Sequence, residues 1–109
     1  MVIDTIVRRC FNTGMKAARL FYDKAVLPDG AIVEMVIWRV PEPVPPTPHG
    51  LKYRLFYGRD GERIVGYDNE RGKGDHRHVR GHEYRYRFMS MDRLVNDFLA
   101  DVANERSGL

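Results

Sequence analysis

Histidine, arginine and lysine side chains are concentrated in one glycine-rich segment, residues 67–82, and their types suit acid–base chemistry on a phosphate. His76 and His78 are two residues apart, so on an extended backbone both side chains point to one side. An unperturbed imidazole titrates near neutral pH and can therefore accept or donate a proton. Metal-free RNA cleavage needs a base, an acid and a cation beside the charged phosphorus. His76 and His78, with Arg77 or Lys73, could fill these catalytic roles.

The same region has a concentrated positive charge. Between Arg71 and Arg87, six basic residues outnumber two acidic ones, a local balance of +4 in a chain whose net charge is +3. A focused patch of this kind attracts phosphate or an acidic protein surface. Gly72 and Gly74 would allow a ligand to approach the backbone, and successive amides in such a loop can form an anion-binding nest. The basic residues predicted to bind phosphate are Arg71, Lys73, Arg77, Arg80, Arg85 and Arg87.

Three other interpretations of this segment stay open. The first is a solvated, charged loop without a ligand, because charged side chains usually face water. The second is a metal site with Asp75, His76, His78 and His82 as donors. His-x-His spacing is compatible with zinc, but no cysteine is near and no helix holds a third ligand, so we predict neither metal nor cofactor. The third gives one histidine a structural role, bonded to Asp68, and leaves the other exposed.

The composition is that of one folded intracellular domain. The chain has 109 residues, a length typical of a single domain with a real core. Its one cysteine, Cys10, excludes an internal disulfide and fits a reducing compartment. No stretch approaches the roughly 20 apolar residues of a membrane span, so we expect a cytoplasmic protein without membrane contact.

Apolar periodicity predicts an α+β fold, an antiparallel β-meander of about five strands with a C-terminal helix packed on one face. Pro28-Asp29-Gly30 and Gly58-Arg59-Asp60-Gly61 are strong turn signals between alternating segments. Ser90 is a good N-cap for a helix that runs to about Asn104 with one apolar stripe. Residues 68–82 have no periodicity and are predicted to be a loop. The predicted strands are residues 16–26, 31–40, 51–57, 62–67 and 83–88.

The first 14 residues differ from the remainder. An apolar stripe there is interrupted by Asn12-Thr13-Gly14, and a regular pattern begins directly after Met15. We predict that residues 1–14 are an N-terminal extension, consistent with a start assigned upstream of the natural one. Residues 15–109 would then form a single domain.

Two stretches resemble the TumE family of small bacterial and archaeal toxin–antitoxin proteins: DGAIVEMVIWRVP at residues 29–41 and YDNERGKGDHRH at residues 67–78. Tyr86-Arg87-Phe88 and residues 97–102 are similar too, and the likeness runs from Met15 to about Glu105. The resemblance implies a type II toxin, neutralised by a helix-turn-helix DNA-binding antitoxin encoded next to it. The functional candidates that it carries over are Asp68, Asn69, Lys73, Asp75, His76, Arg77 and His78. We add Asn69 to the phosphate-binding set and give Asp68 and Asp75 supporting roles.

The leading hypothesis is therefore a toxin that acts on RNA or the translation machinery, including the ribosome, as a metal-independent ribonuclease. In the alternative, the chain is a non-catalytic binding protein whose positive loop docks an acidic antitoxin segment or nucleic acid. Salt sensitivity without RNA cleavage would favour the alternative.

Overall fold

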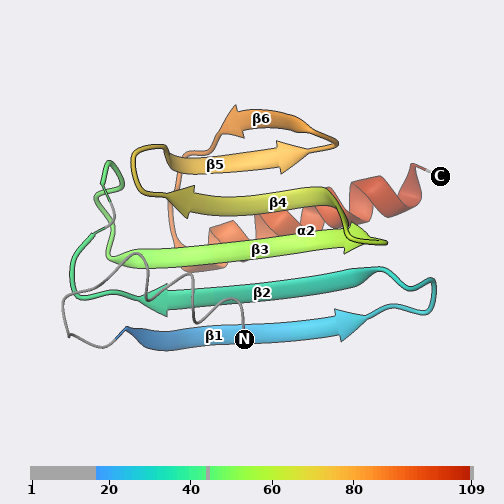
Figure 1. The fold of residues 1–109 in the computed structure, drawn as a ribbon, viewed down its shortest axis with the longest axis horizontal. Helices are drawn as coiled ribbons and strands as arrows, with labels where there is room; N and C mark the ends of the chain where they lie inside the picture. The colour runs from blue at the N-terminus through green and yellow to red at the C-terminus, as the bar shows by residue number, and fades with distance from the viewer. Residues whose placement is uncertain (1–16, 44, 109) are drawn as a thin grey trace.

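The computed structural model describes residues 17–43 and 45–108, which form one antiparallel sheet and one helix (Figure 1). The sheet is a meander, because its strand order is the order of the sequence. The helix lies across one face of β3 and β4 (Figure 1). The elements are β1 Ala18–Val26, β2 Ile32–Arg39, β3 Leu51–Arg59, β4 Glu62–Glu70, β5 Gly74–Val79, β6 His82–Arg85 and α2 Met91–Ser107. The predicted α+β meander with a C-terminal helix on one face is confirmed, with six strands in place of about five.

Tight turns fix the register of the hairpins. Asp60 and Gly61 connect β3 to β4 with φ values of 53° and 76°, and Arg80 and Gly81 connect β5 to β6 with 47° and 82°. Two successive positive φ values are typical of the type I′ turn, whose twist matches that of paired strands. The turn predicted at Asp60-Gly61 is therefore confirmed, whereas the Arg80-Gly81 turn falls inside the predicted loop.

The prediction of a loop over residues 68–82 is wrong. β4 continues to Glu70, and β5 pairs with it so that His76 lies opposite Asp68. The amides of this segment largely belong to a strand ladder, so they do not form the predicted anion-binding nest. The strand was missed because β5 alternates buried and partly exposed positions while its buried positions are Gly74, His76 and His78. An alternation without apolar residues has no hydrophobic signal.

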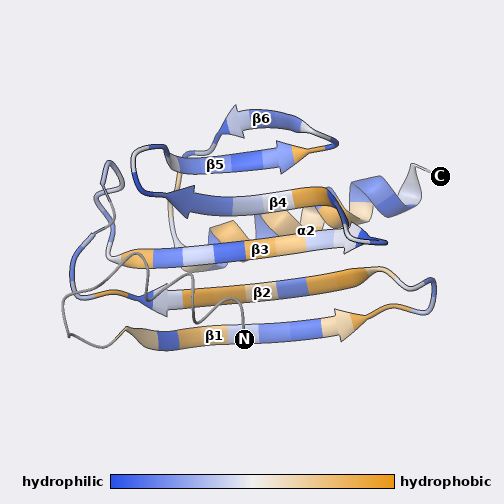
Figure 2. Ribbon diagram, viewed as in Figure 1, coloured by the Kyte–Doolittle hydropathy of each residue, from blue (hydrophilic) through white to orange (hydrophobic). Residues whose placement is uncertain are grey.

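The core lies between α2 and the sheet. Leu94, Phe98 and Val102 are buried on the helix, and Phe98 meets the ring of Tyr67 edge-on at 5.9 Å. Ser90 caps the helix as predicted, since its side chain accepts a hydrogen bond of 3.1 Å from the Arg93 amide. In Figure 2 the hydrophobic colour is prominent on β2, whereas β5 is mostly hydrophilic. None of the described residues of the hydrophobic core belongs to β5, the strand that carries His76 and His78.

The two faces of the sheet have different side chains at β4 and β5. Tyr67 and Arg77 both reach Asp101 of α2, so they point to the helix side. Successive side chains of a strand alternate between faces. Asp68, His76 and His78 consequently point away from the helix, onto a surface that we call the histidine face. Cross-strand pairing adds Arg54, Glu83 and Arg85 to this face.

The predicted N-terminal extension, residues 1–14, lies outside the described residues. None of the helices in the described part of the chain is long and apolar enough to cross a membrane.

Candidate functional site

The histidine face brings together a carboxylate and two imidazoles. Asp68 Oδ1 lies 2.7 Å from His76 Nε2 and 3.9 Å from His78 Nε2. The two rings meet edge-on, with centroids 4.9 Å apart. These residues come from adjacent antiparallel strands, β4 and β5, whose ladder holds the three side chains close together. The sequence prediction that His76 and His78 share one side is confirmed, and Asp68 joins them as the closest carboxylate.

His76 is held on two sides. Its Nδ1 lies 2.9 Å from the carbonyl oxygen of Gly74, and its side chain is only 4% exposed. A carbonyl oxygen can only accept, so Nδ1 bears the proton of this hydrogen bond. The other nitrogen, Nε2, points at Asp68. His76 is therefore a fixed, buried group, which a large substrate cannot reach directly.

His78 is the more accessible of the two histidines. Its Nε2 lies 3.6 Å from Glu83 Oε1, and Glu83 is half exposed on β6. Burial lowers the pKa of His78 below its usual value, and the nearby charge of Arg63 acts in the same direction. Asp68 and Glu83 oppose this shift without cancelling it. Any molecule that reaches the cluster from solvent would meet His78 and Glu83 first.

Basic side chains surround the cluster on the same face. Arg63 crosses over Gly66, where a side-chain Cβ would lie 2.6 Å from the Arg63 Cδ. Arg85 is exposed and lies opposite His76 in the β5–β6 ladder. Lys73 reaches over from the turn after β4, with its Nζ 3.9 Å from Glu83 Oε1. Arg63 was not among the predicted residues, because only the close approach across Gly66 shows which face it occupies.

Several predicted residues lie away from this cluster. Arg77 points to the helix face, where its guanidinium pairs with Asp101 at 2.6 and 3.2 Å. Arg80 pairs with Glu105 of α2. Arg77 therefore does not share a face with His76 and His78, because neighbouring residues of a strand face opposite sides. Arg71 and Arg87 are exposed, in the turn after β4 and in the segment after β6 respectively.

Asn69 is fully buried and bonded to the backbone of β3. Its Oδ1 accepts from the Tyr53 amide at 3.0 Å, and its Nδ2 donates to the Leu51 carbonyl at 2.8 Å. Lys52 donates to the carbonyl of Asn69 itself. All the polar atoms of this side chain thus have protein partners, so we do not retain Asn69 as a phosphate ligand.

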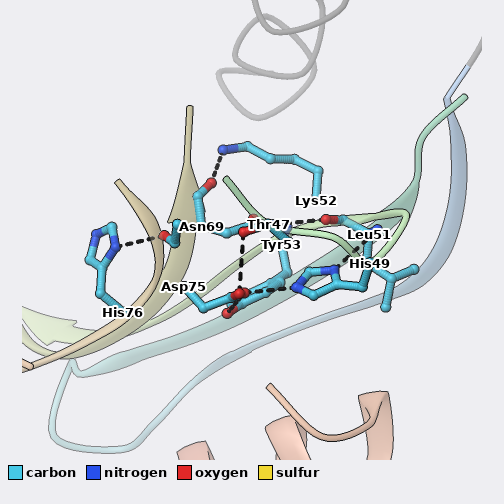
Figure 3. Close-up of polar contacts among 9 residues, drawn as sticks. Thr47, His49, Leu51, Lys52, Tyr53, Asn69, Asp75 and His76 are labelled. Atoms are coloured by element: carbon cyan, nitrogen blue, oxygen red, sulfur yellow. Dashed lines mark hydrogen bonds and ion pairs between the residues drawn. The ribbon is translucent and has the colours of Figure 1, made fainter. Parts of the chain in front are cut away.

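Asp75 belongs to a second polar cluster, separate from the histidine face (Figure 3). Its carboxylate accepts from the Tyr53 hydroxyl at 2.6 Å, His49 Nε2 at 2.8 Å and the Thr47 hydroxyl at 3.2 Å. Burial raises the pKa of Asp75, but the hydrogen bonds from His49 and Tyr53 outweigh it and the net pKa lies below its usual value. This cluster ties the proline-rich segment before β3 to β5. Thr47 and His49 were missed because single polar residues in a proline-rich segment give no signal of a distant partner.

The described residues also contain one group that could hold a metal ion. The donor atoms of Asp68, His76 and His78 all lie within 4.8 Å of one another. The site thus consists of two imidazoles and a carboxylate, edged by exposed basic side chains, on the side of β4 and β5 opposite α2. A site of this composition is suited to an anionic ligand or substrate.

A small α+β protein with a polar cluster of this kind fits many functions, and comparison with known families narrows the choice. The family model described as toxin TumE matches residues 6–106, nearly the whole chain. The protein belongs to the TumE family of toxins. Membership of a toxin family implies an antitoxin as partner. Searches of curated proteins and of solved structures gave no significant match.

Proposed function

We propose that this chain is the toxin of a type II pair that acts on RNA, with the cluster of Asp68, His76 and His78 as its reactive centre. The observation that supports the proposal most directly is the packing of these three side chains within 4.8 Å of one another. Proton-transferring or metal-binding groups at such spacing are typical of sites that cleave phosphodiesters. The proposed partner is a helix-turn-helix DNA-binding antitoxin encoded by the neighbouring gene.

The surrounding charge supports RNA as the substrate. Arg63, Lys73 and Arg85 approach the cluster from three different segments, so a polyanion could contact several of them at once. Positive side chains around a cleft raise the local concentration of an anionic substrate and its rate of association. In this arrangement the arginines and lysine bind phosphate, and the cluster performs the chemistry.

Toxicity and RNA cleavage test the proposal together. The chain is expressed from an inducible promoter, with and without the neighbouring gene, and growth and new RNA 5′ ends are measured. We expect His78→Gln to abolish both toxicity and new RNA ends while the variant still binds the antitoxin. His82→Gln is the matched control, because His82 is exposed on β6 and lies outside the cluster. Undiminished toxicity in His78→Gln would remove the cluster from the mechanism.

A second candidate function is non-catalytic binding of RNA or of an acidic antitoxin segment. The burial of His76 favours it, because a side chain 4% exposed and bonded to Gly74 resembles a structural group. RNA binding that weakens steeply with salt but releases no cleaved product would support this candidate. Replacement of Arg63 and Arg85 by glutamine should then abolish toxicity, while His78→Gln should leave it intact.

A further inference from the structure

We infer that Asp68, His76 and His78 bind one divalent transition-metal ion of the zinc class on the histidine face. From the sequence we expected a metal-independent mechanism. The alternative metal site considered there used Asp75 and His82 as donors in addition to His76 and His78. Asp75 is bonded to His49 and Tyr53 in the other cluster, and His82 is not among the three clustered donors. Asp68, for which we expected only a supporting role, supplies the carboxylate.

The hydrogen bond of His76 to the backbone fixes which ring nitrogen faces Asp68. Since Nδ1 donates to the Gly74 carbonyl, Nε2 is the nitrogen that points into the cluster. This atom lies 2.7 Å from Asp68 Oδ1. Apart from this ion pair, neither of these two buried atoms has a hydrogen-bond partner among the described residues. A distance of 2.7 Å is that of a hydrogen bond with one proton between the atoms, and a metal ion bound to both would replace that proton as they move apart to the spacing of metal ligands.

The environment of His76 is that of a metal-bound histidine. Metal-bound histidines almost always donate their other ring N–H to a carbonyl or carboxylate, which fixes the ring and its tautomer. The Gly74 carbonyl has this position relative to His76. Gly74 has a φ of 80°, a conformation that suits glycine, and β5 begins there. The backbone thus presents its carbonyl to the ring before any ligand arrives.

His78 as the third donor, and the distances between the donor atoms, agree with a small divalent ion. His78 Nε2 lies 3.9 Å from the same Asp68 oxygen. Zinc bonds to histidine and carboxylate of about 2.0–2.2 Å place tetrahedral donors about 3.3–3.5 Å apart. The observed separations of 2.7 and 3.9 Å lie on either side of this value, so a small side-chain adjustment completes the site. Two imidazoles and one carboxylate are also a donor set that zinc and related metals share.

The fourth coordination position of the proposed ion would face solvent. His78 and Glu83 form the accessible side of the cluster, with Glu83 Oε1 3.6 Å from His78 Nε2 and half exposed. Metal sites that perform chemistry use three protein donors and leave the remaining position for water or substrate. A phosphoryl oxygen of RNA fits that position, and this last step rests on the proposed function. Binding of the ion itself does not.

Zn²⁺ binding by the untagged full chain tests the inference. The purified protein is stripped with chelator and titrated with Zn²⁺ alone by calorimetry, and its melting temperature is followed in parallel. We expect one equivalent to bind, the melting temperature to rise, and Asp68→Asn and His78→Gln to weaken binding at least tenfold. His82→Gln should bind as the wild type does. A folded wild-type chain that binds no stoichiometric Zn²⁺, or equal affinity in His78→Gln, would overturn the inference.

A measurement on the unmutated chain covers the case in which a variant does not fold. Imidazole nitrogen resonances are recorded by NMR before and after one equivalent of Zn²⁺. The ring signals of His76 and His78 should shift, while those of His49 and His82 should stay in place. Shifts confined to His49 or His82 would contradict the site. These measurements contain no RNA, so they test metal binding separately from RNA cleavage. If the chain binds Zn²⁺ at this site but produces no new RNA ends in the toxicity experiment, the metal site is retained and only the proposed function is refuted.

Discussion

Replacing Asn69 by alanine should lower the free energy of unfolding and leave RNA binding unchanged. Asn69 lies where the β3–β4 ladder ends, since the last paired residues are Arg54 and Asp68. Beyond that point the Asn69 amide takes the place of a strand, accepting from the Tyr53 amide and donating to the Leu51 carbonyl. The side chain thus extends the sheet by two hydrogen bonds after the β4 backbone has turned away.

The expected cost follows from those two bonds. Loss of the partner of a buried donor or acceptor costs about 1–3 kcal/mol, and Asn69→Ala removes the partner of one donor and one acceptor. We therefore expect the free energy of unfolding to fall by about 3 kcal/mol. In a domain of this size, 1 kcal/mol corresponds to about 4–8 °C, so the melting temperature should fall by roughly 12–24 °C.

Urea unfolding followed by circular dichroism measures this change. Asn96→Ala is the matched control, because Asn96 is exposed on α2 and its loss should change stability by less than about 0.5 kcal/mol. RNA binding by folded Asn69→Ala at low temperature should equal that of the wild type. A loss of stability below about 1 kcal/mol together with weakened RNA binding would contradict the structural role of Asn69 and make it a phosphate ligand again.

Three further predictions concern the packing of α2. Arg77→Gln breaks the partly exposed pair with Asp101 and should cost about 1 kcal/mol in urea unfolding; unchanged stability with lost RNA binding would contradict its structural role. Phe98→Ala empties a fully buried aromatic site and should cost about 3–5 kcal/mol by the same assay, and a cost under 1 kcal/mol would place the core elsewhere. Burial raises the pKa of Tyr67 above its usual 10.0, and the hydrogen bond to Asp101 acts in the same direction. The neutral Tyr67 hydroxyl therefore stabilises the fold fully below about pH 10, and this stabilisation is lost as the pH rises further. Melting temperatures between pH 9 and 11 should therefore fall less steeply in Tyr67→Phe than in the wild type. Identical slopes would show that Tyr67 does not cause the loss of stability at high pH.

The proposed metal site predicts that the activity of the toxin depends on a bound metal ion. A toxin with a bound ion at Asp68, His76 and His78 would lose activity with chelator and regain it with added metal. The burial of His76, which argues against direct contact with RNA, suits a ligand that holds an ion in place. One arrangement thus accounts both for a buried imidazole and for the exposed side at His78 and Glu83.

The sequence determined the elements whose signal is local. β1, β2 and β3, the turn at Asp60-Gly61 and the Ser90 cap follow from alternation, turn chemistry and a side-chain oxygen that can accept from the helix start. Leu94, Phe98 and Val102 of the apolar stripe of α2 are buried, whereas Leu99 of the same stripe is 41% exposed. The predicted grouping of His76 and His78 on one side needed only the two-residue period of a strand.

The residues that His76 and His78 face depend on how the strands pair. The buried positions of β5 are Gly74, His76 and His78, so hydrophobic periodicity was absent and the strand resembled a basic loop. Pairing with β4 then placed Asp68 beside the two imidazoles, and it turned Arg77 to the helix. A side chain's face depends on strand register, and its partner depends on which strand lies next to it. Both are properties of chain segments brought together by folding, which no local pattern of residues specifies.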